Sequence, residues 1–278
     1  MSRLDIQHEG HVCHVYLNRP ELRNAFDAET IAELTHTFSE LTTDKAMRAI
    51  VLGAHGKAFC AGADLNWMRA MADYTWAENH ADGARLAHML WTIASSPVPV
   101  IAKVQGDCYG GGVGLVACCD VVVAADQVGF CLSEAKLGLS PATISPYVIK
   151  ALGERAARRY FVTAERFSAA RAQALGLVHE VCAADDLHEA TQQVVHSITH
   201  NGPAAVRACK QLVKDVAGQP VNDALRDMTA RRIADIRASD EGREGLQAFL
   251  QKHSPAWLAD ARPAPIKPGV RDHAEPND

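Results

Sequence analysis

Residues 98–114 of the chain have the sequence VPVIAKVQGDCYGGGVG. Val98 to Val104 is an apolar run with the length and composition of a buried strand, and glycines crowd the turn that follows it, from Gly106 to Gly114. A short helical pattern then continues to Cys119. A strand, a glycine turn and a helix in this order predict an α/β protein, in which strands alternate with helices in packed layers.

A second segment of small residues, Phe59-Cys60-Ala61-Gly62-Ala63-Asp64, precedes a helix that is expected to start near Leu65. Small residues let a ligand approach the backbone, and the first N–H groups of a helix have no partner within that helix. Two such turns facing each other would present two backbone N–H donors to a developing negative charge. The alternative is that these glycines only let strands and helices pack closely.

The remaining pattern predicts a layered core followed by helices. Period-two alternation predicts a hairpin of residues 4–8 and 11–17, and Asp27 is placed to cap a helix. Apolar runs predict strands at 49–52, 121–125, 128–132 and 177–181. Helical spacing is found at 75–94, 145–162, 168–175, 186–200, 203–217, 221–238 and 241–252. We therefore expect a core domain over residues 1–200, a C-terminal helical region over 201–260 and a flexible tail over 261–278.

Composition excludes several classes of protein. The 278 residues are 48% hydrophobic and 22% charged, which is ordinary for a globular chain. The net charge of −5 comes without a basic block, so we expect no nucleic-acid partner. No apolar run reaches the roughly 18 residues of a membrane span, and the N-terminus lacks a signal peptide's apolar core. The eight cysteines form no C-x-x-C pair, which predicts reduced thiols and a cytoplasmic location.

The histidines do not form a metal motif. His8, His11 and His14 would point to alternating faces if they lie on a strand. His196 and His200 could share one face of a helix, but no acid or cysteine follows at motif spacing. We therefore expect no metal site.

One alternative function is an NAD-dependent oxidoreductase. Gly112 to Ala117 fits the G-x-G-x-x-A dinucleotide fingerprint, and Glu134 lies 20 residues beyond Gly114, where an acid would bind a ribose hydroxyl. Such a fingerprint usually follows the first strand of its unit, however, and here more than 100 residues precede it. This alternative also leaves the segment 59–64 without a role.

Several motifs, taken in order, resemble the enoyl-CoA hydratase/isomerase (crotonase) superfamily over nearly the whole chain. The matching segments are 18–20, 24–26, 57–64, 99–102, 110–112, 119–120, 130–138, 170–178 and 241–249. The resemblance implies an α/β spiral of stacked ββα turns with a C-terminal helical region that builds trimers, often paired into hexamers. It also implies an acyl-coenzyme A thioester as substrate, with coenzyme A part of that substrate and no further cofactor.

The same resemblance assigns roles to the two small-residue segments. By position, the backbone N–H groups of Ala61 and Gly111 would hold the thioester carbonyl oxygen. Arg23 and Ala25, Lys57, and the turn Ala61-Gly62-Ala63-Asp64 would contact coenzyme A. The alternative for Arg23 and Lys57 is an ordinary exposed basic side chain.

The acid–base residues depart from the family pattern. Hydratases of this family typically use two glutamates, one of which stands two residues after the third glycine; here that position is Gly114. The second position is filled by Glu134, which we expect to be the general acid/base. The missing side chain at Gly114 would leave space for the acyl chain or for another side chain. The alternative for Glu134 is a surface carboxylate in a salt bridge.

A single glutamate leaves the reaction open between hydration and isomerisation. Residues 141–147 and 66–68 look similar to hydratases of 3-methylglutaconyl-CoA and related branched carboxy-acyl thioesters. A carboxylate on the acyl group would need a cationic or hydroxyl partner, and the nearby candidates are Lys136, Thr143, Ser145 and Tyr147. We expect an enoyl-CoA hydratase, with an isomerase or a catalytically silent acyl-CoA-binding scaffold as alternatives.

Overall fold

The computed structural model describes residues 2–260. Its strands are β1 (Leu4–Glu9), β2 (Val12–Leu17), β3 (Ala49–Ala54), β4 (Ala58–Cys60), β5 (Val100–Val104), β6 (Asp107–Tyr109), β7 (Val121–Ala125), β8 (Gly129–Cys131), β9 (Arg166–Ser168) and β10 (Glu180–Cys182). Its α-helices are α1 (Ala28–Thr43), α2 (Leu65–Met71), α3 (Trp76–Ser95), α4 (Gly111–Ala117), α5 (Ser145–Leu152), α6 (Glu154–Thr163), α7 (Ala169–Leu175), α8 (Leu187–Thr199), α9 (Pro203–Val216), α10 (Asp223–Ala238), α11 (Asp240–Gln251) and α12 (Trp257–Asp260).

The strands form two sheets that the chain visits in alternation. One sheet has the order β1-β2-β3-β5-β7-β10, and the other has the order β4-β6-β8-β9. Three times in succession, a strand of the first sheet is followed by a strand of the second: β3 then β4, β5 then β6, β7 then β8. Helices follow each of these pairs, so the chain winds as a spiral of stacked ββα turns. The α/β fold expected from the sequence is confirmed.

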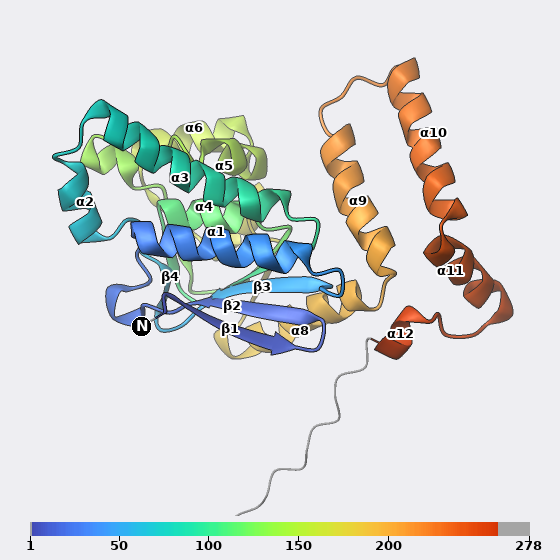
Figure 1. Ribbon diagram of the computed structural model, residues 1–278. Helices are drawn as coiled ribbons and strands as arrows, with labels where there is room; N and C mark the ends of the chain where they lie inside the picture. Colours follow the sequence, from blue (N-terminus) through green and yellow to red (C-terminus); the bar gives the residue numbers. More distant parts are fainter. Residues whose placement is uncertain (1, 261–278) are drawn as a thin grey trace, which may run out of the picture.

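The core lies between the larger sheet and the helices that cover it. In Figure 1, α1 and α3 lie above the sheet and α8 lies below it. The strands β3 and β5 pair in parallel and are almost wholly buried, as expected for a parallel sheet covered on both faces. Asp27 caps α1 as predicted, since its carboxylate accepts the N–H of Thr30.

The structure corrects several predicted boundaries. Gly153, with φ of +77°, divides the single helix expected over 145–162 into α5 and α6, because this backbone conformation ends one helix before the next begins. The strands β4, β6 and β9 are not predicted by the sequence pattern, whereas α2 begins at Leu65, where a helix start is expected. The strand expected at 177–181 lies at Glu180–Cys182 instead.

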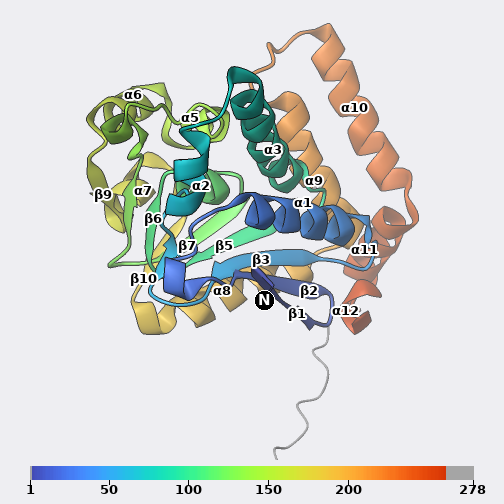
Figure 2. The same ribbon diagram turned by 60° about the vertical axis from the view of Figure 1, so that its left-hand side comes forward.

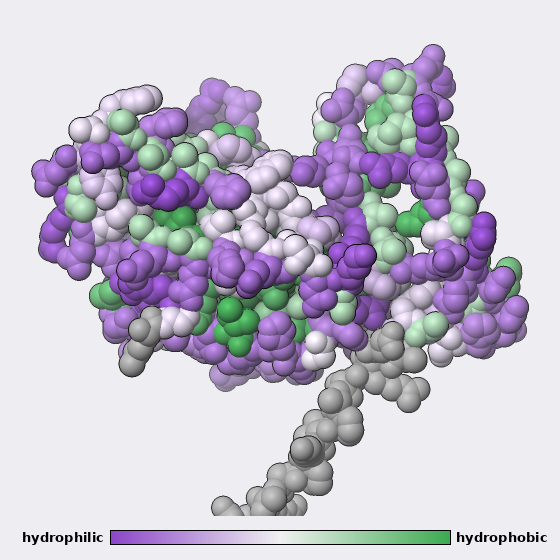
Figure 3. Space-filling view, viewed as in Figure 1, coloured by the Kyte–Doolittle hydropathy of each residue, from purple (hydrophilic) through white to green (hydrophobic). Residues whose placement is uncertain are grey.

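The helices α9, α10 and α11 lie beside the layered part of the molecule (Figures 1 and 2). Apolar atoms are exposed along the facing sides of α9 and α10 (Figure 3), and large apolar side chains exposed on these helices are Leu212, Val213, Ile233, Leu246, Phe249 and Leu250. The division at residue 200 stays a prediction, and the tail expected at 261–278 lies outside the described residues. Among residues 2–260, no helix has the length and apolar composition needed to cross a membrane.

Candidate functional site

The turn after β4 is held by the segment that precedes α1. Phe26 donates its N–H to the carbonyl of Gly62 (2.7 Å), and its own carbonyl accepts the N–H of Asp64 (2.7 Å), so Phe26 and Ala63 form an isolated parallel bridge. Gly62 has a φ of +91°, which favours glycine. Within residues 2–260, the N–H of Ala63 has no hydrogen-bond acceptor.

Ala61, one of the two donors expected from the sequence, has its N–H engaged. That N–H donates to the carbonyl of Arg23 at 3.0 Å. A ligand oxygen would have to displace this bond, whereas the N–H of Ala63 in the same turn is unused. The structure therefore offers Ala63, and not Ala61, as the donor of this turn.

The second turn, Gly110 to Gly112, lies directly against the first. Gly110 has a φ of +50° and donates its N–H to the carbonyl of Cys131 (2.8 Å), and α4 then begins at Gly111. A methyl group added to Gly111 would lie 2.8 Å from Cε2 of Phe26, and one added to Gly112 would lie 2.7 Å from Cβ of Cys60. These contacts leave no room for side chains. In the part of the chain that the structure describes, the Gly111 N–H has no acceptor.

Glu134 brings a carboxyl group to these turns. It begins the 3-10 helix η2 (Glu134–Leu137) after β8. A methyl group added to Gly110 would lie 3.2 Å from Oε1 of Glu134 and 3.9 Å from Cα of Gly62, so the carboxyl group, the 110–112 turn and the 61–64 turn meet at one place. Burial raises the pKa of Glu134, and its Oε2 is buried without a hydrogen-bond partner among residues 2–260. Such a carboxyl is suited to proton transfer.

The space beside Gly114 is filled by the protein itself. Gly114 is buried, and a methyl group added to it would lie 2.2 Å from Cγ2 of Ile144 and 3.6 Å from Cδ2 of Leu90. Of the two occupants expected from the sequence, an acyl chain or another side chain, the structure shows a side chain. Gly112 and Gly114, which also belong to the dinucleotide fingerprint, thus face protein atoms rather than open space.

A buried ion pair fixes the 61–64 turn from its other end. Arg19 donates from Nη2 to Oδ2 of Asp64 (3.0 Å) and from Nη1 to the carbonyl of Ala25 (2.9 Å). Asp64 caps α2 by accepting the N–H groups of Asn66 and Trp67. Burial opposes ionisation of Asp64, but these two N–H bonds and Arg19 outweigh it and lower the pKa. Both side chains are below 10% exposed, so Asp64 shapes the turn rather than facing solvent.

Asn24 holds the neighbouring loop and was not singled out from the sequence. It has a φ of +55°, accepts the N–H of Arg19 at Oδ1, and donates from Nδ2 to the carbonyls of His55 and Ala58. From the sequence, Asn24 belongs to a segment that matches the family and to the loop, with Arg23 and Ala25, that resembles the family's coenzyme A contacts. The available signal was the place of Asn24 in the chain, directly after Arg23 and before Ala25, which were both expected to contact coenzyme A.

The residues expected to contact coenzyme A lie around this turn, with different exposure. Arg23 and Lys57 are exposed, and among residues 2–260 their side chains have no ion-pair partner, so both are free to meet a phosphate. Ala25 is buried, and its carbonyl oxygen accepts a hydrogen bond from Arg19.

The residues expected to meet an acyl carboxylate lie on η2 and before or at the start of α5. Lys136 is exposed and stands on η2 with Glu134, while Thr143 is half-buried. The hydroxyl of Ser145 donates to the carbonyl of Ala142 (2.8 Å), so it is already bonded. Tyr147 is half-buried, and burial raises its pKa.

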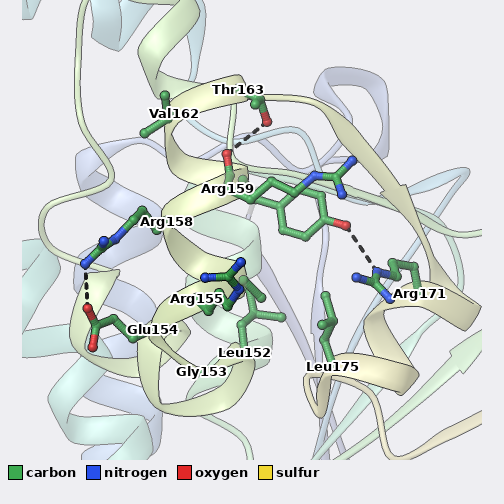
Figure 4. A pocket seen from close by; sticks show the side chains of 12 residues that line it. Leu152, Gly153, Glu154, Arg155, Arg158, Arg159, Val162, Thr163, Arg171 and Leu175 are labelled. Carbon is green, nitrogen blue, oxygen red and sulfur yellow. Dashed lines mark hydrogen bonds and ion pairs between the residues drawn. The ribbon is translucent and has the colours of Figure 1, made fainter.

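The large depression shown in Figure 4 is a different place. It has a volume of about 840 Å³ and is lined by the end of α5, by α6 and by α7. Its lining includes neither Glu134 nor any residue of the two turns. Two of its arginines are ion-paired, Arg158 with Glu154 (2.7 Å) and Arg159 with Glu165 (2.5 Å). The depression is therefore separate from the place where Glu134 and the two turns meet.

Metal-ligating side chains do not gather at this site. Among the described residues, no group of three or more His, Cys, Asp or Glu side chains could hold a metal ion. The rings of His196 and His200 stack on each other at a centroid distance of 3.5 Å.

Comparison with known proteins gives consistent matches over almost the whole chain. The family model described as enoyl-CoA hydratase/isomerase matches residues 7–260. The 2,3-dehydroadipyl-CoA hydratase of Escherichia coli is 31% identical over 258 residues, which cover 92% of this chain and 98% of the relative. The mevalonyl-coenzyme A hydratase of Aspergillus fumigatus is 30% identical, covering 89% and 91%. The crystal structure of an enoyl-CoA hydratase from Shewanella pealeana is 41% identical with a TM-score of 0.89, covering 92% and 96%.

Proposed function

Because this chain belongs to the enoyl-CoA hydratase/isomerase family and is an enzyme of the hydro-lyase type, we propose that it adds water across the 2,3 double bond of an enoyl-CoA thioester. Glu134 is the acid–base residue in this proposal. The observation that carries it is the half-buried Glu134 carboxyl, with its raised pKa, lying against the Gly110 turn beside two unused backbone N–H groups.

The oxyanion donors are the N–H groups of Ala63 and Gly111. Addition to a 2-enoyl thioester moves negative charge onto the carbonyl oxygen, and donors fixed there stabilise that charge more than the ground state. Loss of one such donor typically costs about 10²–10³ in rate. Ala63 takes the place that the sequence alone had suggested for Ala61, since the Ala61 N–H is bonded to Arg23.

Glu134 serves both proton transfers. As the water oxygen bonds to C3, the Glu134 carboxylate accepts a water proton, and the π electrons move through C2 to the thioester oxygen. When the enolate collapses, the carboxyl returns a proton to C2, so the residue ends as it began. Both events occur on one face of the substrate, which predicts syn addition. A raised pKa suits a group that must both accept and return a proton.

A branched carboxy-acyl thioester such as 3-methylglutaconyl-CoA is the proposed substrate. Lys136 is the cation that supports this choice, since it is exposed and lies two residues beyond Glu134 on the same short helix. Thr143 adds a hydroxyl group that is half-buried. Coenzyme A would be held by the exposed Arg23 and Lys57 and by the 61–64 turn.

Assembly into a trimer or hexamer through the C-terminal helices is part of the proposal. Phe249 is 81% exposed and Leu250 is 76% exposed on α11, which is more apolar surface than a lone helix normally presents to water. Location in the cytoplasm is likewise proposed, from cysteines without a pairing motif.

A panel of coenzyme A thioesters tests the function. Hydration of a 2-enoyl thioester abolishes the absorbance of the conjugated system, whereas isomerisation of a 3-enoyl thioester creates that absorbance. The isomerase is the second candidate, because a single carboxyl group can carry a proton between two carbons. We expect loss of absorbance with 2-enoyl substrates. No change with either class would leave only the acyl-CoA-binding scaffold.

A further inference from the structure

Phe26 contacts both of the turns that carry the proposed oxyanion donors. Its backbone N–H and carbonyl bond to Gly62 and Asp64, the residues on either side of Ala63. Its ring lies against Gly111, with Cε2 and Cδ2 at 2.8 and 3.0 Å from where a Cβ on Gly111 would stand. The side chain is fully buried, 1% exposed, so protein atoms surround the ring.

We infer that Phe26 is a positioning residue that sets the separation between the N–H groups of Ala63 and Gly111. This inference rests on the proposed function. The backbone of Phe26 fixes Ala63 on one side, and the ring limits how closely Gly111 can approach on the other. Because packed interiors transmit small changes in volume to their neighbours, a different side chain at position 26 would move one donor relative to the other.

Further contacts join the segments around Phe26 and limit how far the two turns can shift. Arg19 bonds to the carbonyl of Ala25 and to the carboxylate of Asp64, which joins the same two segments a second time. On the other side, Gly112 packs against Cys60, so the start of α4 is held against the end of β4. Within that limit, the size of the side chain at position 26 decides where Gly111 lies relative to Ala63.

Two substitutions change this contact in opposite directions. Phe26→Leu removes ring atoms and lets Gly111 move, whereas Gly111→Ala keeps the N–H donor but drives a methyl group into the ring. Phe38→Leu is the matched control, because Phe38 is equally buried and lies on α1, outside both turns. We expect kcat to fall about 10- to 100-fold in each of the first two variants, since misplacement of a reacting geometry by about 1 Å can cost 10² in rate. KM should change less than about threefold, because the donors act mainly in the transition state.

A spectroscopic measurement separates positioning from general damage to the fold. The probe is a para-dialkylaminocinnamoyl thioester of coenzyme A, whose absorbance moves to longer wavelength when its carbonyl oxygen accepts hydrogen bonds. Wild type and Phe38→Leu should show the full shift, and Phe26→Leu and Gly111→Ala a smaller one. The double variant Phe26→Leu/Gly111→Ala should be more active than the product of the two single losses, because leucine makes room for the methyl group.

The outcomes distinguish this inference from the function on which it rests. If Phe26→Leu keeps the absorbance shift and the turnover of Phe38→Leu, Phe26 is not a positioning residue. That result leaves the proposed function in place. A wild-type protein that neither shifts the probe nor hydrates any thioester would overturn the proposed function, and the inference with it. If Phe26→Leu does not fold, the Gly111→Ala variant and its shift decide the question.

Discussion

Ile144 occupies the space that a side chain on Gly114 would need, with its Cγ2 only 2.2 Å from the position of the missing Cβ. In the enoyl-CoA hydratase pattern that this sequence resembles, the position of Gly114 carries the first of two catalytic glutamates. The site is therefore built around one carboxyl group, that of Glu134, and the lost glutamate is replaced by apolar packing rather than by an empty space. Restoring the family pattern consequently requires a glutamate at position 114 and a smaller residue at position 144.

Gly114→Glu should destabilise the protein without adding a second catalytic group. The new side chain would meet Ile144 and Leu90 in a buried position, and overpacking alone costs about 1–3 kcal/mol, before the cost of burying a carboxylate. Urea unfolding measures this loss. Gly114→Glu/Ile144→Gly, which opens space, should unfold at a higher urea concentration than Gly114→Glu. A Gly114→Glu variant as stable as wild type and more active would contradict the packing described here.

Arg19→Met should be strongly destabilising. It removes one partner of a buried pair and leaves Asp64 charged in the interior, which typically costs about 3–5 kcal/mol. Arg158→Met is the control, because its pair with Glu154 is exposed on both sides and such pairs contribute about 0–1 kcal/mol. Denaturant unfolding at neutral pH compares the two, and equal losses would remove Arg19 from the support of the 61–64 turn.

Glu134→Gln should make the protein more stable at neutral pH and change little in acid. Burial raises the pKa of Glu134 in the folded state. The folded protein therefore binds more protons than the unfolded chain between the two pKa values, and stability falls as pH rises through that window. Glutamine does not titrate, so the gain should be present above the folded-state pKa and absent below the ordinary carboxyl value. Unfolding curves recorded from acid to neutral pH test the sign of the stability difference between Glu134→Gln and wild type. A variant that is less stable than wild type at neutral pH would contradict it.

Phe249→Glu should convert an oligomer into a smaller species while leaving the fold of each chain intact. Phe249 is exposed on α11, so the charge costs little in a single chain and much in a covered interface. Val162→Glu, on α6, makes the same change at another exposed apolar position. Light scattering at micromolar concentration gives the masses. Dissociation caused by Val162→Glu alone would place the interface on another surface. A monomeric wild type would contradict assembly altogether.

The sequence predicted the layered core because its strongest signals are local. Val98 to Val104 and the glycines after it became β5 and the start of α4 nearly as expected. The strands β4 and β6 were missed because they are three residues long and have no usable periodicity. They are strands only through partners far along the chain, such as Cys108 opposite Phe130.

The same limit applies to the site. Glu134 and the glycine turns could be selected from spacing and resemblance, and the structure brings them together. Which N–H of the 61–64 turn is unused could not be predicted, because the acceptor of the Ala61 N–H is the carbonyl of Arg23, in a separate loop. The roles of Ile144 and Phe26 likewise depend on contacts between distant segments, which a sequence pattern does not contain.

The central claim is that Glu134 alone carries the proton transfers, and turnover of Glu134→Gln on the enoyl-CoA panel tests it most directly. Glutamine keeps the shape of the side chain and removes the base. Positioned acid–base groups contribute about 10²–10⁴ in rate, so kcat should fall at least about 10²-fold for hydration, with a much smaller change in KM. A Glu134→Gln variant that retains more than about a tenth of wild-type activity, well above that range, would contradict the claim.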